Sequence, residues 1–148
     1  MVVGYDGSPA AEAALERGLD RTLHGGRLYV VHAWEPPHVL SGAPYYGILA
    51  SGSFERAEAM MEELARRCPR LREAGASASV LEGHAPDVIA GLAEEVDADE
   101  IVVGTHGAGR AGALMGSVAH GLLHTAGCPV TVIPERALRD AGGRRAVV

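Results

Sequence analysis

The sequence predicts an α/β protein built on one doubly wound, five-stranded parallel sheet with helices on both faces. Five short runs rich in valine or isoleucine alternate along the chain with segments whose apolar residues recur every three or four positions. Continuous apolar runs are typical of strands that helices cover on both sides. Parallel strands need a covering element between them, so this order favours right-handed crossovers within one sheet. A chain of 148 residues suits one compact domain.

The five expected strands are each bounded by turn residues. The last of them would lie at an edge of the sheet, and an exposed apolar edge strand is usually covered or paired. We therefore expect the last strand to be covered by another element or paired with another strand. In chain order, the runs are MVVGY (1–5), RLYVVHAW (27–34), SASVLEG (77–83), EIVVGT (100–105) and PVTVIP (129–134).

The first helix is marked at both ends. Ser8 is the expected N-cap, Pro9 takes the first helical position, and Glu12 lies near the third. Gly25 and Gly26 close the segment. These signals agree with one another and predict a well-bounded helix.

Three further helices complete the pattern. The longest carries one apolar stripe and is expected to kink or end at Pro69. Two shorter helices are predicted over residues 85–97 and 116–127, the second of which ends before Pro129. The stripe of the longest helix consists of Phe54, Ala57, Met61, Leu64, Cys68 and Leu71.

Two segments fit no regular element. Residues 35–51 hold three prolines, two glycines and a pair of tyrosines, and they predict a mobile loop near the carboxyl ends of the strands. Residues 136–148 are rich in arginine and are expected to form a partly disordered C-terminal tail. The folded domain is therefore expected to span residues 1–135.

Composition and charge exclude several classes of protein. The formal net charge of -6 argues against a broad nucleic-acid surface, which needs clustered positive charge. All thirteen residues counted as Lys and Arg are arginines, so a Walker A loop, which needs a lysine, is excluded. The two cysteines form no disulfide framework, and neither a leader pattern nor a run of about 18 apolar residues occurs. We expect a cytoplasmic protein that binds small molecules or proteins, with no membrane and no nucleic-acid partner.

The most informative stretch is VVGTHGAGRAGALMGSVAHG, residues 102–121, where a strand runs into a glycine-rich loop and then a helix. In an open α/β sheet, ligands bind beyond the carboxyl ends of the strands. The glycines let the backbone approach a ligand, and the N–H groups at the start of the helix favour an anion. The stretch predicts a phosphate cradle built without lysine, which Ser117 and Arg110 would assist. A plain turn in a glycine-rich chain is the alternative from the residues alone.

Three segments resemble the universal stress protein family, in the same order and over nearly the whole chain. They are VGYDGSPAAEAAL at the start, LYVVHAW in the second strand and VVGTHGAGRAGALMGSVAHGLLHTAGCPVTVIP at the end. The nucleotide-binding members carry G-x2-G-x9-G-[S/T], whose fixed positions correspond here to Gly104, Gly107, Gly116 and Ser117. This chain departs from the motif, because only the eight residues AGRAGALM separate Gly107 from Gly116. The resemblance implies a Rossmann-like fold of the adenine nucleotide alpha hydrolase type.

The resemblance also implies a ligand site for ATP or another adenine nucleotide, with Mg²⁺. Asp6 would face the adenine, and Ala33 would line the base pocket. The shortened loop would alter or remove triphosphate contacts, unless the additional glycines at 109 and 112 absorb the change. A homodimer through the last strand, across a two-fold axis, is implied as well. The remaining implied site residues lie around the ribose and phosphates: Gly104, Thr105, His106, Gly107, Gly116, Ser117 and Val118.

Several of these residues also have a purely structural interpretation. Asp6 can cap the Asp-Gly turn that follows it, and Ser117 can be the N-cap of the last helix, a role compatible with phosphate binding. His32, inside an apolar strand, is interpreted as a satisfied core histidine. His120 and His124 have the spacing of a zinc pair, but the helix is expected to end before the next cysteine, and no metal site is predicted.

Two further groups have simple expected roles. The acidic residues between 94 and 100 are expected to face solvent at a helix end and turn. Cys68 and Cys128 are expected to be small buried hydrophobes.

The leading functional hypothesis is a non-enzymatic, adenine-nucleotide-binding regulatory protein of the stress response. In this hypothesis a nucleotide stabilises a conformation that a regulatory protein partner, unknown from the sequence, recognises. The alternative is a protein-interaction module of the same fold that has lost nucleotide binding through its shortened loop. A third reading is a slow ATP hydrolase, for which the sequence offers neither a nucleophile elbow nor an evident general base.

Overall fold

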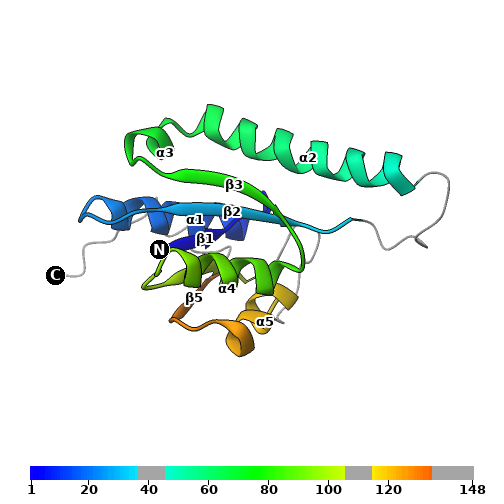
Figure 1. Ribbon diagram of the computed structural model, residues 1–148. Helices are drawn as coiled ribbons and strands as arrows, with labels where there is room; N and C mark the ends of the chain where they lie inside the picture. The colour runs from blue at the N-terminus through cyan, green and yellow to red at the C-terminus, as the bar shows by residue number, and fades with distance from the viewer. Residues whose placement is uncertain (37–45, 106–114, 135–148) are drawn as a thin grey trace.

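The sheet has five parallel strands, as the sequence predicts, in the order β3-β2-β1-β4-β5 (Figure 1). The computed structural model describes residues 1–36, 46–105 and 115–134. The predicted C-terminal tail, 136–148, lies outside the described residues. In chain order, the elements are β1 (Val2–Gly4), α1 (Pro9–Thr22), β2 (Tyr29–Trp34), α2 (Tyr46–Arg67), α3 (Pro69–Glu73), β3 (Ser77–Glu82), α4 (Ala85–Glu95), β4 (Ile101–Gly104), α5 (Ser117–Thr125) and β5 (Val130–Ile133).

Helices cover both faces of the sheet. On one face, α1, α2 and α3 pack around Val3, Val30 and Val102. On the other, α4 and α5 pack around Val2 and Val31. Neighbouring valines of one strand therefore point to opposite faces, as a pleated strand requires, and all five are fully buried. This burial on both sides explains why the strands appear in the sequence as continuous apolar runs.

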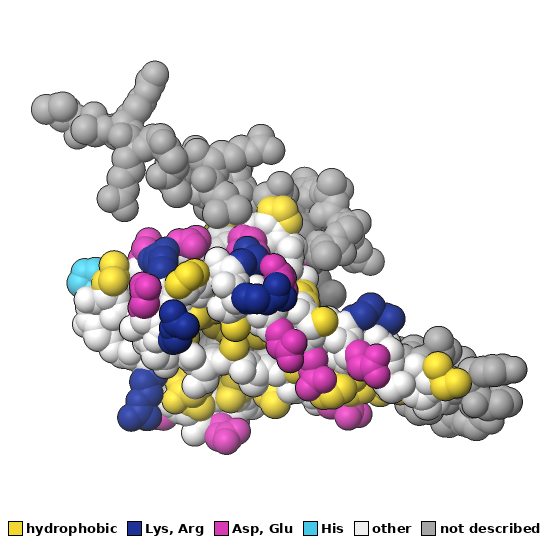
Figure 2. All heavy atoms as spheres, turned by 90° about the horizontal axis from the view of Figure 1, so that it is seen from above, with side chains coloured by type: hydrophobic (Ala, Val, Ile, Leu, Met, Phe, Trp, Pro, Cys, Tyr) yellow, Lys and Arg dark blue, Asp and Glu magenta, His cyan; other side chains and the backbone are white. Residues whose placement is uncertain are grey.

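The side of the molecule that carries α2 is charged with both signs. Arg70 of α3 forms ion pairs with Glu16 and Asp20 of α1, and Arg66 pairs with Glu63 within α2. Figure 2 looks onto this side and shows acidic and basic side chains intermingled.

The start of α1 is capped as predicted, but Glu12 does not take part in the cap. Ser8 is the N-cap, and its Oγ accepts the N–H of Ala11 at 3.1 Å. The N–H of Ser8 donates to Oδ1 of Asp6 at 3.0 Å, so Asp6 supplies the acceptor that a capping box takes from a glutamate. Glu12 lies one position too far along the helix for that bond and binds Arg67 of α2 instead.

α2 begins earlier than the sequence predicts. Residues 46–51, which were expected to belong to a mobile loop, form its first turns. Gly47 and Gly52 lower the helix propensity of this stretch, but no proline interrupts the helix before Pro69, so it extends back toward residue 46. At its other end α2 stops at Arg67, just before Pro69, as predicted.

Glu100 corrects the expectation that the whole acidic run 94–100 faces solvent. Its side chain is buried, its Oε1 accepts the hydroxyl of Thr131 at 2.6 Å, and its Oε2 lies 3.4 Å from the guanidinium of Arg21. Glu100 directly precedes the buried strand β4, so its side chain lies against the neighbouring strand rather than in water. It therefore links the end of α1 to β4 and β5.

Within the described part of the chain, no helix combines the length and apolar character needed to cross a membrane. The longest, α2, has 22 residues and carries arginines and glutamates along its length.

Candidate functional site

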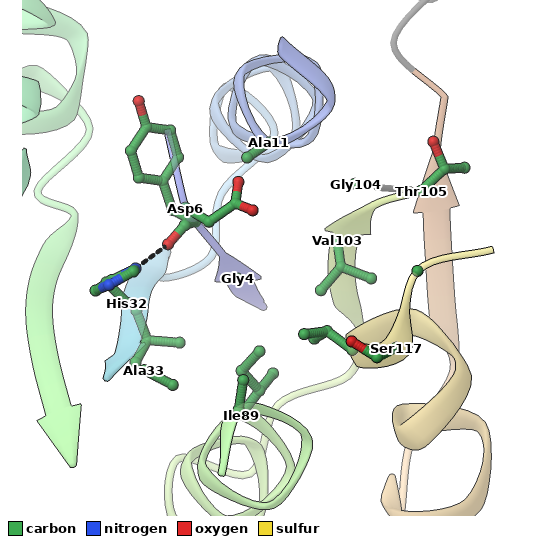
Figure 3. A pocket seen from close by; sticks show the side chains of 15 residues that line it. Gly4, Asp6, Ala11, His32, Ala33, Ile89, Val103, Gly104, Thr105 and Ser117 are labelled. Atoms are coloured by element: carbon green, nitrogen blue, oxygen red, sulfur yellow. Dashed lines mark hydrogen bonds between the residues drawn. The ribbon is translucent and has the colours of Figure 1, made fainter. Parts of the chain in front are cut away.

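A pocket opens at the carboxyl ends of β1 and β4 (Figure 3). From β1 the chain proceeds outward through β2 to β3, whereas β4 and β5 lie on the other side of β1. Such a switch point is where open α/β sheets bind ligands. The pocket has a volume of about 310 Å³, which is within the range of small-molecule sites. Its described lining consists of Gly4, Tyr5, Asp6, Ala11, Val31, His32, Ala33, Ala85, Ile89, Val103, Gly104, Thr105, Gly116, Ser117 and Val118.

Most of the site residues predicted from the sequence lie together in this pocket. They come from the end of β1, from β2, from the end of β4 and from the start of α5. His106, Gly107 and Arg110 lie outside the described residues, as does most of the shortened glycine loop. The predicted residues that line the pocket are Asp6, Ala33, Gly104, Thr105, Gly116, Ser117 and Val118.

Backbone hydrogen bonds join the two ends of the glycine loop. The N–H of Gly116 donates to the carbonyl of Thr105 at 2.6 Å, and the N–H of Thr105 donates to the carbonyl of Ile133 in β5 at 2.9 Å. The loop therefore begins and ends at one place on the pocket rim. Because the N–H of Gly116 is used within the protein, the anion-binding N–H groups predicted for this helix begin at Ser117.

Gly116, and not Ser117, is the N-cap of α5. Gly116 has the extended backbone of a cap residue, with φ -63° and ψ 157°, and Ser117 is the first helical residue. This corrects the structural interpretation of Ser117 as the cap. Glycine has no side chain that could accept the N–H groups of the first turn, and no side-chain cap bond forms there among the described residues. Together with the helix dipole these N–H groups form a positive edge of the pocket.

Two more helices begin at the same pocket. Ala11, in the first turn of α1, and Ala85, the first residue of α4, both line it. Three helices thus begin beside one cavity, and the positive ends of their dipoles lie near it. Among the described lining residues there is no lysine or arginine, and Asp6 is the only carboxylate. The described walls therefore offer an anion backbone N–H groups and helix dipoles rather than a basic side chain.

Gly104 lacks a side chain for a reason of packing. A Cβ at this position would lie 2.7 Å from Cβ of Ala10, 2.8 Å from its carbonyl carbon and 2.9 Å from the backbone nitrogen of Ala11. A side chain here would therefore collide with α1. The glycine of the motif allows α1 to lie close against β4, a requirement that the spacing of the glycines does not indicate.

Asp6 lies between the end of β1 and the first turn of α1. Its Oδ1 accepts the N–H of Ser8, and Gly7 between them has the left-handed φ of +77°. This is the Asp-Gly turn that the sequence predicts. Asp6 also lines the pocket, so the turn and a ligand contact are compatible roles for the same carboxylate.

His32 is hydrogen bonded, as the sequence predicts, and it also lines the pocket, which the sequence did not indicate. Its Nδ1 lies 2.8 Å from the carbonyl oxygen of Tyr5. A carbonyl can only accept, so Nδ1 carries the hydrogen. The bond ties the end of β1 to β2, directly beside Asp6.

The apolar floor of the pocket was not predicted. A Cβ at Gly4 would lie 2.8 Å from Cδ1 of Ile89 and 3.0 Å from Cγ1 of Val103, so α4 packs closely on β1 at this point. The apolar residues that follow Ala85 were recognised as one face of a helix. Only the order of the strands shows that this helix lies under the predicted site.

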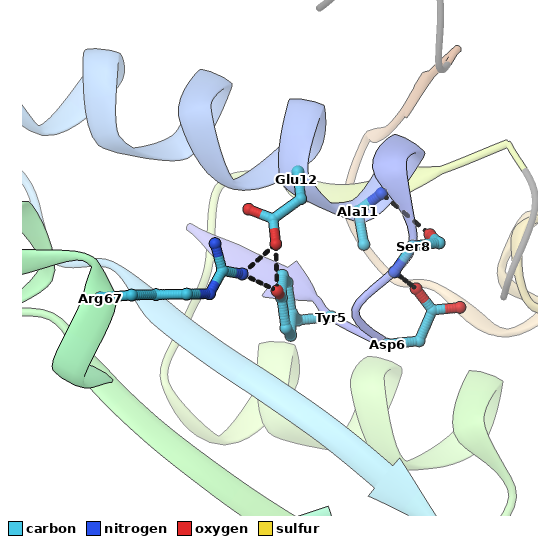
Figure 4. Close-up of polar contacts among 6 residues, drawn as sticks. All are labelled: Tyr5, Asp6, Ser8, Ala11, Glu12 and Arg67. Carbon is cyan, nitrogen blue, oxygen red and sulfur yellow. Dashed lines mark hydrogen bonds and ion pairs between the residues drawn. The ribbon is translucent and has the colours of Figure 1, made fainter. Parts of the chain in front are cut away.

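Behind Asp6, three polar side chains form a closed cluster between the end of β1, α1 and α2 (Figure 4). The hydroxyl of Tyr5 donates to Oε1 of Glu12, and Arg67 donates from Nη2 to the Tyr5 oxygen at 2.5 Å and to the same Glu12 oxygen. Burial, and then the hydrogen bond and the charge of Glu12, raise the pKa of Tyr5 above its ordinary value. The hydroxyl therefore keeps its proton in the folded protein when free tyrosine would lose it.

Alkaline pH should destabilise the wild type more than the variant Tyr5→Phe. The unfolded wild type loses the tyrosine proton near its ordinary pKa of about 10, while the folded state retains it, so stability falls as pH rises through that value. Phenylalanine has no such proton. We expect the free energy of unfolding in urea to fall further for the wild type between about pH 8 and about pH 11. An equal fall in the two proteins would contradict the raised pKa.

His120 and His124 lie side by side on α5, with ring centroids 5.1 Å apart, and both are exposed. Among the residues that the structure describes, no group of three His, Cys, Asp or Glu side chains is placed to hold a metal ion. Cys68 and Cys128 are free thiols that are only partly buried, and they pack on opposite faces of the sheet.

The fold and the pocket define a doubly wound α/β protein with a cavity at its switch point. The chain belongs to the universal stress protein family, which it matches over residues 1–134. A universal stress protein of Thermus aquaticus is 35% identical over 135 residues, a match that covers 90% of this chain and 96% of that protein.

Solved structures show the same fold. Universal stress protein UspA from Lactobacillus plantarum superposes with a TM-score of 0.76 at 21% identity, covering 89% of this chain and 94% of that one. A universal stress protein in complex with cAMP superposes with a TM-score of 0.61 at 27% identity, again over 89% and 94% of the two chains. Structural relatives of this chain thus include a protein that binds an adenine nucleotide.

Proposed function

We propose that this chain binds an adenine nucleotide in the pocket between β1 and β4 and acts, without turnover, as a regulatory protein of a stress response. The observation that carries the proposal is a single cavity lined by the carboxylate of Asp6 and by the N-terminus of α5 at Ser117. These two groups suit the two ends of a nucleotide, a base with hydrogen-bond donors and an anionic phosphate. Membership of the family and the relative bound to cAMP support the same ligand class.

The base would lie against Asp6 and the apolar part of the pocket. A carboxylate accepts hydrogen bonds, and the exocyclic amino group of adenine donates them. Guanine has a carbonyl at the corresponding position, which an ionised carboxylate cannot bond. Ala33 and Ile89 line the same cavity and would pack against the ring. With the 6-position of the base directed at Asp6, the site should therefore prefer adenine, whereas guanine would have to turn its N1–H and 2-amino edge toward the carboxylate.

The phosphate would lie at the start of α5. The N–H groups of Ser117 and Val118 belong to the first helical turn, and the Ser117 hydroxyl is a further donor. Gly104 and Thr105, at the end of β4, would lie beside the ribose. His106, Gly107 and Arg110 are proposed to complete the phosphate contacts from outside the described residues.

Mg²⁺ would be held mainly by the nucleotide. Asp6 is the only carboxylate among the described lining residues, and no cluster of three potential ligands occurs in the described part of the chain. Mg²⁺ commonly binds through substrate phosphates and water with one or two protein carboxylates, so this limited donor set fits an ion that arrives with ATP.

AMP should raise the melting temperature of the protein. A ligand that binds only the folded state stabilises it by about 2.7 kcal/mol at a hundredfold excess over Kd. For a chain of this size, that free energy corresponds to roughly 5–10 °C. Thermal denaturation with AMP, and with GMP as the control for the base, measures the effect. If neither AMP, cAMP nor ATP with Mg²⁺ shifts the melting temperature at millimolar concentration, the proposal is wrong.

The variant Asp6→Asn tests whether Asp6 recognises the base, without a large effect on the stability of the fold. Asparagine keeps the size of the side chain, and its carbonyl can still accept the N–H of Ser8, but the charge is removed. We expect AMP affinity, measured by calorimetry, to fall about tenfold, because a hydrogen bond to a charged group is stronger than one to a neutral group by roughly 0.5–2 kcal/mol. Asp20→Asn, at an exposed position of α1, is the matched control and should bind AMP like the wild type.

The second candidate function is a protein-interaction module of the same fold without nucleotide binding. The loop that is one residue shorter than the family motif favours it. The titration above distinguishes the two, because the interaction module should bind none of the nucleotides.

We also propose that two copies pair through β5. β5 is an edge strand of the sheet, and its residues are only partly buried in the single chain. An apolar edge strand is a ready template for pairing. Sedimentation should give a dimer at micromolar concentration. The carbonyls of Pro129 and Ile133 accept from β4 and from the residue that follows it, so the N–H of Val132 lies on the open side of β5, and Val132→Pro should weaken the dimer by removing that donor. A wild type that sediments as a monomer would contradict this pairing.

A further inference from the structure

Tyr5 connects the pocket to α2 through its side chain and its main chain. Its side chain is 4% exposed, and its hydroxyl is bonded to Glu12 and to Arg67, the last residue of α2. Its N–H donates to the carbonyl of Val31 at 2.8 Å, and its carbonyl accepts Nδ1 of His32 at 2.8 Å. The residue before Asp6 is therefore held from α1, α2 and β2 at once.

The same contacts continue into the pocket. Asp6 follows Tyr5 in the chain, and its Oδ1 accepts the N–H of Ser8, whose Oγ in turn accepts the N–H of Ala11. Figure 4 shows these bonds and the Tyr5 cluster on the two sides of one short corner between β1 and α1. Asp6 and Ala11 both line the pocket. A displacement of Tyr5 can therefore move the carboxylate of Asp6, which lines the pocket.

We propose that Glu12 and Arg67 are positioning residues for ligand binding, which hold Tyr5 so that the carboxylate of Asp6 stays in place at the pocket. This proposal rests on the proposed nucleotide-binding function. Neither residue touches the pocket, and both act through Tyr5. Because coupling between two sites is reciprocal, a bound nucleotide also stabilises the contact between α2 and the end of β1.

The chain offers a matched control for Arg67. Arg70, three residues further on, also joins α1 to the next helical segment, through Glu16 and Asp20. The side chains of Arg67 and Arg70 are 44% and 42% exposed, so the two substitutions remove arginines of similar exposure that both bind carboxylates of α1. Arg70 does not contact the corner that carries Asp6. A difference between the two variants therefore reports on position and not on the loss of an ion pair.

Arg67→Met should weaken AMP binding about five- to tenfold, as expected for contacting residues that are energetically coupled. Arg70→Met should change it by less than about twofold, since ion pairs at exposed sites contribute little. Tyr5→Phe, which removes a single oxygen, is the milder variant and should also weaken AMP binding. It provides the test if Arg67→Met folds poorly. In an Asp6→Asn background, Arg67→Met should have little further effect, because the carboxylate that it positions is gone.

Amide hydrogen exchange of Ser8 gives a readout without nucleotide. The N–H of Ser8 donates to Asp6, so its exchange rate should rise in Arg67→Met. In Arg70→Met the rate should equal that of the wild type. Equal exchange of the Ser8 N–H in these two variants overturns the positioning role. Full AMP affinity in Arg67→Met overturns it as well. So does an Arg67→Met substitution that weakens AMP binding as much in the Asp6→Asn background as in the wild type. A wild type that binds neither AMP, cAMP nor ATP with Mg²⁺ refutes the proposed function, and the exchange of Ser8 then still decides whether Arg67 positions the corner.

Discussion

Replacement of Gly104 by alanine should lower the free energy of unfolding by about 2–3 kcal/mol, in the upper part of the range for overpacked cores. The added Cβ would lie 2.7 Å from Cβ of Ala10 and 2.9 Å from the backbone nitrogen of Ala11, closer than van der Waals contact allows. These atoms cannot move unless α1 moves with them. Leu15 and Leu19 of α1 are buried in the core, so a shift of the helix disturbs the packing of one face of the sheet.

Gly91→Ala is the control for Gly104→Ala. Gly91 lies in α4, is exposed, and has no atom within 4 Å of an added Cβ. Alanine there should stabilise the protein by about 0.5–1 kcal/mol, because it is the better helix former. The melting temperatures of the two variants should therefore shift in opposite directions from that of the wild type, with a fall of roughly 4–12 °C for Gly104→Ala. If the two variants melt alike, α1 and β4 do not lie as close as the structure has them.

Local signals made the fold predictable. The valine pairs of the strands, the cap at Ser8 and the stop at Pro69 each concern a few neighbouring residues, and the structure confirms all of them. Ser117 was predictable as a pocket residue for a related reason, because it begins a helix at the carboxyl edge of a parallel sheet and the order of elements brings that helix to the switch point. Asp6, which only the resemblance to the family placed at the ligand, lines the same pocket.

The parts that the sequence could not predict depend on contacts between distant segments. Arg67 meets Tyr5 across 62 residues, and no periodic pattern indicates that pair. Glu100 looks like part of a solvated acidic run until its bond to Thr131 is known. Gly104 resembles a ligand glycine, but the position of α1 explains it. In each case the residue has a role that only the arrangement of the helices and strands defines.

The pocket is joined to the core on both faces of the sheet. Tyr5 and Ala11 belong to the core under α1 and α2, and Ile89 and Val103 to the core under α4 and α5. All four also line the pocket. A ligand that is held by both layers would stabilise their relative position, so stability and affinity should respond together to changes between α4 and α5.

Gly121→Ala tests this connection from the α5 side. A Cβ at Gly121 would lie 2.5 Å from Cγ and 2.8 Å from Cβ of Pro86 in α4. A proline ring is closed onto its own backbone and cannot swing aside, so α4 and α5 must separate. Alanine in place of glycine would stabilise an isolated helix by about 1 kcal/mol. We nevertheless expect a net loss of about 1–2 kcal/mol in the free energy of unfolding, because the overpacking is larger than this gain.

The separation of α4 and α5 should also weaken ligand binding. Ile89 of α4 and Val118 of α5 both line the pocket, so AMP affinity should fall in Gly121→Ala and remain unchanged in Gly91→Ala. Pro86→Ala removes the ring that the new Cβ meets. In that background Gly121→Ala should be neutral or stabilising, and the double-mutant cycle should give a coupling of roughly 0.5–3 kcal/mol. An equal loss of stability in both backgrounds would show that Pro86 is not the obstacle and that another contact sets the distance between α4 and α5.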